Sequence, residues 1–409
     1  MQVACAALVS PLGWASEGER LFHLENRVQL KYDDNINQSS DSDTNKTDGM
    51  VIADDVTVTA DRNLENGFIG LRYRTVYTAY DDRESDNTDW NHDLSVILNR
   101  ILTPRVTLGL VENFIYVESP EVFAPDGTLQ HQNSTYIYNT VNGTVSTLIR
   151  PLLRLDTSGR YQFIRYDEQS LSQREDYDIY AAGLTLRNQW AKETSVFTEV
   201  RYESQSYTGA SDTQDGSISF PGSPEQHNVV PDRGFDTISF GAGIDRVFTQ
   251  QLNGSLRGGL MQKTYSEANT DNESAPYAEA SVGYAASAST RFALSAVYSL
   301  YQSSLITFVN QTRTSFALSA THDLTSKISG SVGATLIDSQ YDAKDSVNTL
   351  SEATVEDGSE TAYSLYARLA YSVNRSNWLE VGVNTTNLSS DYSDGFDQNI
   401  FDISWKTRL

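Results

Sequence analysis

The chain has 409 residues and a formal net charge of −24 at pH 7, from 54 acidic and 30 basic residues. This balance argues against a nucleic-acid partner, because phosphate backbones are bound by basic surfaces. Hydrophobic residues make up 39% of the chain, but no apolar run approaches the ~18 residues of a membrane-spanning helix, which excludes a helical membrane protein. No Gly/Ser or Pro linker divides the sequence, so one domain is expected.

The first fifteen residues are typical of an export signal. They are apolar and small, and the Gly-Trp-Ala sequence at 13–15 resembles a signal-peptidase site. A truncated start would explain why the positively charged segment is absent. Residues 1–15 are therefore predicted to be a signal peptide, and residues 16–409 the mature domain. Cys5, the only cysteine, falls in this leader. A lipoprotein cysteine is the alternative, disfavoured because Gln2 stands where such a site has Leu.

Apolar and polar residues alternate with a period of two along the mature chain, which predicts β-strands. Segment 90–110 shows the pattern most clearly. Trp90, Leu94 and Leu98 share one apolar side, Val106 and Leu108 begin the next strand, and a short connection with a proline joins the two. Each strand has about the ten residues that a tilted strand needs to cross a bilayer. This hairpin is interpreted as transmembrane.

The same alternation predicts about eighteen strands, and sixteen or twenty stay open because strand boundaries are uncertain by a few residues. The connections alternate between about 2 to 7 and about 8 to 26 residues, as in outer-membrane barrels with short periplasmic turns and longer external loops. The predicted strands are 22–32, 50–58, 69–79, 90–99, 106–110, 135–148, 153–163, 180–186, 196–202, 238–244, 252–260, 278–284, 292–300, 316–320, 328–336, 363–371, 379–385 and 401–409.

Because hydrocarbon offers no partner for unpaired backbone groups, such a sheet must join its first and last strands. The predicted fold is thus all-β: a single transmembrane antiparallel up-and-down β-barrel with its apolar side towards lipid and both termini on the short-turn, periplasmic side. A soluble propeller or solenoid is the main competitor. It is disfavoured because no fixed-period motif recurs, the strands are long, and the second face is too polar to form another core.

Acidic, Asn/Ser/Thr-rich segments lie between the predicted strands, at 33–48, 81–89, 209–233 and 342–360, and are predicted to be solvated loops. Segment 41–45 begins like a calcium-binding loop. However, Lys46 occupies the glycine position and Ile52 stands where a bidentate Glu belongs. No metal or cofactor is therefore predicted, and diffuse divalent-ion binding near lipopolysaccharide stays open.

Aromatic residues near strand ends are expected to lie at the two membrane interfaces. They are Tyr32, Tyr80, Trp90, Trp190, Tyr341 and Trp378.

Three short motifs resemble a known family. They are Tyr-Asp-Asp-Asn-Ile at 32–36, Thr-Val-Tyr-Thr-Ala-Tyr-Asp-Asp at 75–82 and Leu-Thr-Pro-Arg-Val-Thr-Leu-Gly at 102–109. The chain resembles putative beta-barrel porin family 2, Gram-negative outer-membrane barrels that often accompany exopolysaccharide synthesis and export. The resemblance implies an outer-membrane location, a role as polysaccharide conduit and a periplasmic polysaccharide-export partner. The last strand, 401–409, also resembles a barrel-insertion signal, but it ends in Leu instead of an aromatic residue.

The strand phase directs ten arginines to the lumen, among acidic residues such as Glu199 and Glu380. These arginines are Arg27, Arg72, Arg74, Arg154, Arg160, Arg187, Arg201, Arg257, Arg313 and Arg368. Because arginine binds carboxylates in a bidentate way and repels cations, they are predicted to line a path for an anionic or sugar-like solute. The alternative is that these charges only pair with one another across the barrel wall.

Two functional classes stay open. One is a conduit, either for polysaccharide export or as a porin for small anionic solutes. The other is a non-conducting surface barrel that acts through its long loops, especially 118–133 and 209–233. The expected surroundings are outer-membrane lipid and lipopolysaccharide. An enzyme is not expected, because the five histidines lie in no nucleophile motif. They are His23, His92, His131, His227 and His322.

Overall fold

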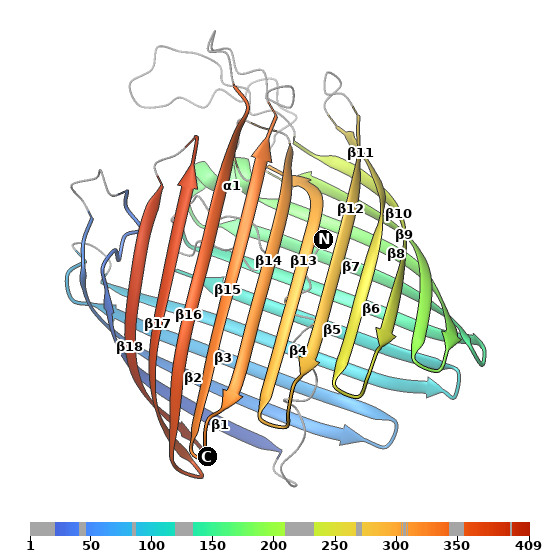
Figure 1. Cartoon of the computed structure of the whole chain (residues 1–409). Coiled ribbons are helices and arrows are strands. Elements are labelled where there is room, and N and C mark those ends of the chain that lie inside the picture. The colour runs from blue at the N-terminus through green and yellow to red at the C-terminus, as the bar shows by residue number, and fades with distance from the viewer. Residues whose placement is uncertain are drawn as a thin grey trace.

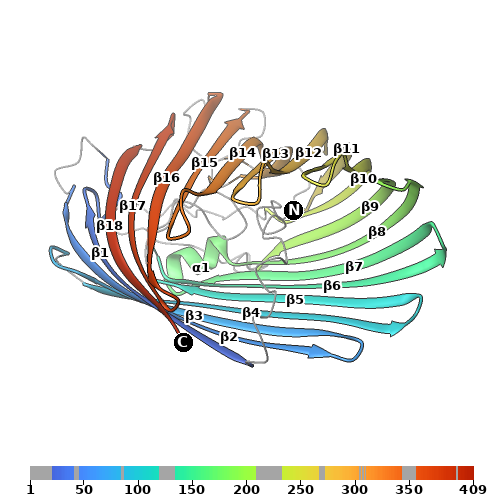
Figure 2. The same cartoon turned by 60° about the horizontal axis from the view of Figure 1, so that its bottom comes forward.

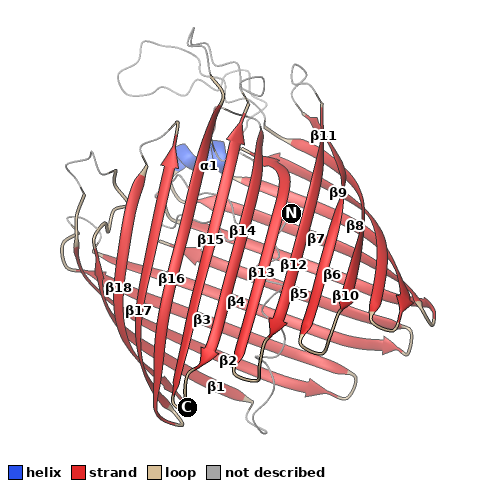
Figure 3. Ribbon diagram, viewed as in Figure 1, coloured by secondary structure: helices blue, strands red, loops and turns tan. Residues whose placement is uncertain are grey.

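The computed structural model describes residues 21–40, 46–83, 87–118, 134–208, 233–266, 272–303, 305, 308, 310–342, 356–392 and 395–409. These residues form eighteen strands and one short helix, α1 (Figures 1 and 3). All strands belong to one sheet, in which each pairs antiparallel with its sequence neighbours and β1 also pairs with β18. The sheet is therefore a closed up-and-down barrel, as predicted, and no backbone edge is left to face hydrocarbon.

The strands follow one another around the wall in chain order (Figure 2). Their bounds are β1 Phe22–Asp33, β2 Gly49–Leu64, β3 Gly67–Tyr80, β4 Thr88–Thr103, β5 Val106–Val117, β6 Tyr136–Arg150, β7 Leu153–Tyr166, β8 Tyr177–Ala191, β9 Thr194–Tyr207, β10 Phe235–Val247, β11 Leu252–Tyr265, β12 Glu273–Ala285, β13 Thr290–Gln302, β14 Asn310–Asp323, β15 Ile328–Tyr341, β16 Gly358–Asn374, β17 Asn377–Ser390 and β18 Phe396–Arg408. Each predicted strand overlaps one of these in order, so the predicted number of eighteen is confirmed.

The strands extend further than predicted at the short turns. The hairpin connection expected over 100–105 is only 104–105, because β4 continues to Thr103 through a register irregularity between Ile101 and Thr103. Likewise, the connection between β2 and β3 is only 65–66. Gly67 begins β3 where a Cβ atom would lie 2.2 Å from the Asn99 carbonyl oxygen, so the close approach of two strands requires glycine there.

Short and long connections alternate strictly along the chain. Those after even-numbered strands have two or four residues, and those after odd-numbered strands have five or more. Four of the long connections, 81–87, 266–272, 303–309 and 391–395, have five or seven residues, below the predicted range of about 8 to 26. The start of β1 pairs with the end of β18, from Glu25 opposite Arg408 onwards, so both ends of the sheet lie at the short-turn end.

The outer surface is apolar along nearly every strand. Leu184 on β8 is 47% exposed, Leu260 on β11 66%, and Val381 on β17 53%, whereas the residues that alternate with them are mostly polar and less exposed. Burying large apolar side chains is the normal outcome in water. Their systematic exposure here means that the surrounding solvent is the hydrocarbon of a membrane.

The expected interfacial aromatic residues fall into two groups. Tyr32, Trp90 and Trp190 are exposed on the outer surface, as predicted. Tyr341 is only 2% exposed and packs inside the barrel against Phe308 and Tyr392, so this prediction was wrong. Tyr80 and Trp378 also lie in the inward phase of their strands, next to outward Ala79 and Leu379, because an odd shift along a strand reverses the face.

Several predictions fall outside the described residues. These are the leader at 1–15, the acidic segment at 41–45, and nearly all of the loops at 118–133 and 209–233. Among the described residues, no helix is long and apolar enough to cross a membrane.

Candidate functional site

The structure places all ten predicted arginines on the inner face of the barrel. Each one alternates with outward neighbours: Arg257, for example, follows Leu256, which is 55% exposed on the lipid side. Arg187 in the same way follows Leu186, which is 42% exposed. The ten side chains therefore share one face of the sheet, and their role in a solute path stays a prediction.

Eight of the ten arginines form ion pairs with inner-face carboxylates. The largest group runs across β7 to β12, where Glu199 accepts from Arg201 at 2.7 Å and lies 3.8 Å from Arg257, which also pairs with Glu279. The remaining contacts of this group are Arg154 with Asp156 at 2.9 Å, Arg187 with Asp156 at 3.9 Å and with Asp245, and Arg160 with Glu203. The arginines on these strands thus pair across the wall, which is the alternative considered from sequence.

A second group closes the seam between the first and last strands. Arg27 on β1 pairs with Glu380 on β17, which also lies 3.7 Å from Arg368 on β16. Arg368 in turn donates to Asp402 on β18 at 3.1 Å. These contacts tie four strands together at the point where the barrel closes.

Three predicted arginines, one of them ion-paired, belong to neither of these two groups. Arg74 makes a bidentate contact with Asp55 across the β2–β3 pair, at 2.9 to 3.1 Å. Arg313 is 1% exposed, and its guanidinium carbon lies 3.5 Å from the centre of the Tyr301 ring. Within the described chain, Arg72 makes no ion pair.

Sequence reasoning missed some inner-face charges, chiefly Asp55, Asp402 and Lys263. All three lie in the inward phase of their strands, so the same alternation would have found them. Lys263 is 2% exposed, and its ammonium group lies 3.8 Å from the Phe235 ring centre and donates to the Asn310 side-chain oxygen at 3.0 Å.

Two glycines let an aromatic ring lie flat on this wall. A Cβ atom on Gly241 would meet the Tyr277 hydroxyl at 2.0 Å, and one on Gly259 would meet the Tyr277 ring at 2.8 Å. Tyr277 is therefore only 2% exposed and can donate from its hydroxyl to Glu199 at 3.0 Å. This hydrogen bond fixes the carboxylate that Arg201 and Arg257 share.

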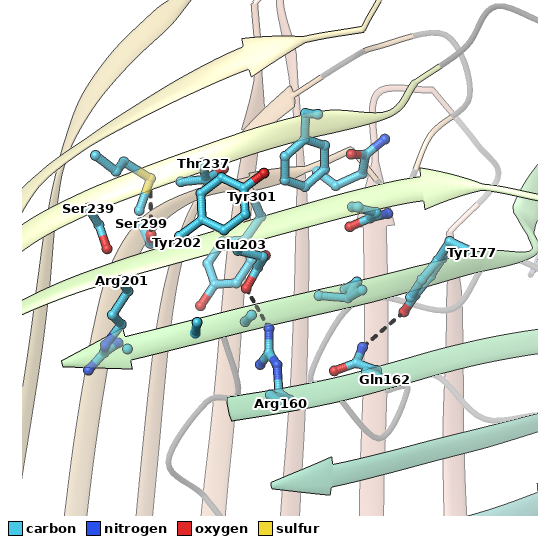
Figure 4. Close-up of a pocket in the computed structure, with 18 of the residues that line it drawn as sticks. Arg160, Gln162, Tyr177, Arg201, Tyr202, Glu203, Thr237, Ser239, Ser299 and Tyr301 are labelled. Carbon is cyan, nitrogen blue, oxygen red and sulfur yellow. Dashed lines mark hydrogen bonds and ion pairs between the residues drawn. The ribbon is translucent and has the colours of Figure 1, made fainter. Parts of the chain in front are cut away.

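The inner wall encloses a cavity of about 340 Å³ between β6 and β14 (Figure 4). In the figure the Arg160 and Glu203 side chains face each other, and the Gln162 amide donates to the Tyr177 hydroxyl. Tyr301 enters the cavity wall from β13. The lining combines tyrosine rings with amides and hydroxyl groups. The aromatic, amide and hydroxyl lining residues are Tyr138, Tyr166, Tyr177, Tyr202, Tyr207, Phe235, Tyr301, Asn142, Gln162, Gln205, Gln302, Thr144, Ser158, Thr237, Ser239, Ser299 and Ser303.

The cavity lining carries an excess of positive charge. Two carboxylates, Glu175 and Glu203, line it, against five cationic side chains. The cationic residues are Arg160, Arg201, Arg257, Lys263 and Arg313. A second cavity of about 470 Å³, along β1 to β5 and β18, is lined by Lys31 and Arg74 against Asp33 and Asp93 and so is balanced.

Helix α1 (Gln169–Glu175) was not predicted and lies inside the ring of strands, towards the long-connection end (Figure 2). Leu171, 4% exposed, is the one residue it buries. Arg233, 2% exposed, donates to Glu175 at 2.7 Å and to the Arg174 carbonyl at 3.0 Å, and its guanidinium carbon lies 4.6 Å from the Tyr207 ring centre. Burial acts to lower the pKa of Arg233, but Tyr207 and Glu175 outweigh it and raise that pKa above its usual value.

The sequence matches the family described as "Putative beta-barrel porin 2" over residues 18–408, nearly its whole length. The chain belongs to this family. It is accordingly an outer-membrane β-barrel of the porin type, as its resemblance to that family implied. No curated protein matches the sequence of this porin.

Several solved structures are similar to this porin at low sequence identity. OccAB4 from Acinetobacter baumannii is 10% identical with a TM-score of 0.46, and the match covers 95% of this porin and 99% of OccAB4. OpdK from Pseudomonas aeruginosa, solved with vanillate, is 10% identical with a TM-score of 0.45, over 95% of this porin and 99% of OpdK. The ferric citrate transporter FecA is 12% identical with a TM-score of 0.45, and the match covers 90% of this porin but 60% of FecA.

Of the two cavities of this porin that lie along β6 to β14 and along β1 to β5 and β18, only the first is lined by more cationic than acidic side chains. Among the described residues, no group of three or more His, Cys, Asp or Glu side chains could hold a metal ion. His92 on β4 and His322 on β14 lie in the outward phase of their strands. Their Nδ1 atoms form hydrogen bonds with the hydroxyl groups of Tyr73 and Thr290. His131 and His227 lie outside the described residues.

Proposed function

We propose that the lumen conducts anionic or sugar-like solutes and that the cavity between β6 and β14 holds the solute during passage. The observation that carries this proposal is the lining of five cationic and two acidic side chains in a chain whose net charge is −24. Positive charge on a confined wall attracts anions and repels cations. Glu199 and Glu279, which pair with Arg201 and Arg257, do not line the cavity themselves.

The other lining residues support the sugar-like part of the proposal. Tyrosine rings such as Tyr177 offer apolar faces on which the face of a sugar ring packs, and they keep a polar hydroxyl. Gln302 presents an amide whose nitrogen and oxygen are both buried without a hydrogen-bond partner, so it can serve a hydroxylated solute as donor and acceptor.

The alternation of short and long connections supports an orientation for this transport. In outer-membrane barrels the short turns face the periplasm and the longer loops face the outside. We therefore place the start of β1 and the end of β18 at the periplasmic side. Helix α1, whose Glu175 lines the cavity, then lies towards the outside.

Ion selectivity in planar bilayers tests the proposal. Lys263→Gln combined with Arg313→Gln removes two of the five lining cations, and we expect the ratio of anion to cation permeability to fall by about threefold. Arg154→Gln is the matched control, because Arg154 lies on the inner face but does not line the cavity. An unchanged ratio in the double variant, or an equal fall in the control, would contradict the proposal.

Polysaccharide export is the narrower form of this proposal and needs a cellular test. Deleting the gene is expected to lower secreted polysaccharide, and wild-type protein but not the Lys263→Gln, Arg313→Gln variant is expected to restore it. Normal secretion in the deletion strain would exclude export and leave a porin for small solutes.

The second candidate is a non-conducting surface barrel. The observation that favours it is that α1, fastened by Arg233, lies within the lumen. Absence of any conductance from the folded wild-type protein would select this function. The loops at 118–133 and 209–233, which would then carry the interaction, remain a prediction.

A further inference from the structure

Two carboxylates lie on the lipid-facing side of the barrel, in the middle of the apolar band. Asp54 on β2 is exposed between outward Ile52 and Val56, and its neighbours across the sheet are Val28 and Tyr77. The Asn26 side-chain amide donates to Asp54 at 2.5 Å. Asp54 is thus flanked by apolar side chains and the Tyr77 ring, whereas Asn26 has Thr407 of β18 as its other cross-strand neighbour. Among the described residues, no cation pairs with Asp54.

Glu112 repeats this arrangement on β5. It lies opposite outward Val96 and Val141, in phase with Leu110 and Phe114. The Asn139 amide on β6 donates to it at 3.4 Å. Both lipid-facing carboxylates thus have one asparagine partner each, from the neighbouring strand.

The rest of the described outer wall contains no such group at mid-height. At the same height β8, β9, β10, β16 and β17 present only apolar residues or threonine outward. Examples are Leu184, Val200, Phe240, Leu369 and Val381. The two carboxylates are therefore confined to the sector of β1 to β6.

Hydrocarbon cannot solvate these groups. Ionisable side chains in a membrane are costly and normally face protein or water, where hydrogen-bond donors are available. An asparagine amide satisfies only part of a carboxylate, which has about four acceptor positions. A surface that keeps two such groups needs further donors from outside the barrel.

The same sector gathers aromatic rings, which are enriched at protein interfaces. Tyr73 and His92 stack with ring centres 6.1 Å apart and share a 2.9 Å hydrogen bond. The ring centres of Trp90 and Tyr77 are 4.8 Å apart, and those of Tyr116 and His92 are 5.8 Å apart. The Tyr116 hydroxyl already donates to Glu118 at 2.7 Å, and the Tyr73 hydroxyl is bonded to His92. The groups that can donate sideways are the Tyr77 hydroxyl, the Trp90 indole and the second ring nitrogen of His92.

We propose that this outward surface of β1 to β6, the β1–β6 face, is the contact between two copies of the chain in the membrane. It carries both the acceptors, Asp54 and Glu112, and the donors, Asn26, Asn139 and the aromatic groups. A two-fold contact needs such self-complementarity, because the same patch meets itself. Six strands spaced ~4.8 Å apart, across a band ~25 Å tall, give roughly 700 Å² per copy, close to the ~800 Å² of a standard interface.

Cysteine cross-linking of the full-length protein in membranes tests the proposal. In a Cys5→Ser background, Leu94→Cys at the centre of the face is expected to form a disulfide-linked dimer under mild oxidation. Leu184→Cys, equally lipid-facing but on β8, is the matched control and is expected to stay monomeric. Cross-linking at neither position, or equally at both, would overturn the proposal.

A second variant separates specific contact from random encounter. Asp54→Leu with Glu112→Leu is expected to weaken the dimer by about tenfold, measured from the cross-linked fraction and from the mass of the detergent-solubilised protein. A purely lipid-exposed face would instead tolerate both leucines with no change in mass. An unaltered dimer in this variant would therefore refute the assigned contact, and circular dichroism verifies that the barrel is folded.

Discussion

Leu184→Arg is expected to lower the free energy of unfolding of the membrane-inserted barrel by about 2 to 4 kcal/mol. Leu184 lies at the middle of β8, is 47% exposed on the outer surface, and has Thr157 and Val200 as its cross-strand neighbours. A guanidinium placed there would have to leave water for hydrocarbon without a counter-charge. Equilibrium unfolding by denaturant in lipid vesicles measures the loss.

The adjacent position provides the matched control. Thr185 points into the barrel, where its cross-strand neighbours are Asp156 and Glu199. Thr185→Arg therefore places the same charge in luminal water, beside two carboxylates that already pair with arginines. Because water solvates the new guanidinium there, we expect a change within about 1 kcal/mol. Equal losses in the two variants would mean that the two faces of β8 had been assigned the wrong way round.

The fold was predictable because a membrane imposes one simple pattern. In β8, Tyr180, Leu184 and Leu186 face a solvent that accepts only apolar groups, while Arg187 faces water, so every second residue reports its side. This constraint weakens beyond the hydrocarbon. The end of β4 continues pairing to Thr103 through Ile101 and Leu102, which are adjacent, apolar and both exposed, so the alternation there carries no signal.

The pairing of the inner charges was not predictable to the same degree. The phase of a strand says which face a residue takes, but a partner depends on the register between strands. Arg27 and Glu380 are 353 residues apart and meet only because β1 closes onto β18. The sequence therefore located the arginines but could not decide between paired charges and a selective path.

Helix α1 shows a second limit. Its seven residues contain a single buried apolar side chain, Leu171, so no helical periodicity exists to be recognised. Its position depends instead on Arg233, 58 residues from Glu175 in sequence. The cavity was also beyond prediction, because it combines side chains from β6 to β14 with this helix.

Glu380→Gln is expected to lower the free energy of unfolding by about 2 to 3 kcal/mol. Glu380 is 6% exposed and lies between Arg27 and Arg368, with the Ser404 hydroxyl 3.5 Å from its carboxylate. The amide removes the negative charge that both guanidinium groups share. Luminal water reaches these arginines in part, so the expected loss is smaller than that for breaking a fully buried ion pair. Denaturant unfolding in vesicles measures it.

Glu25→Gln is the matched control at the same seam. Glu25 contacts Lys406 at 2.7 Å and Arg408 at 3.2 Å, but these groups lie at the open short-turn end, where Arg408 is 53% exposed. Water replaces the lost contact there, so we expect a change below about 1 kcal/mol. If the two variants lost the same stability, the seam would be held by its backbone ladder alone. A larger loss for Glu380→Gln means that the barrel closes through charges buried in its wall.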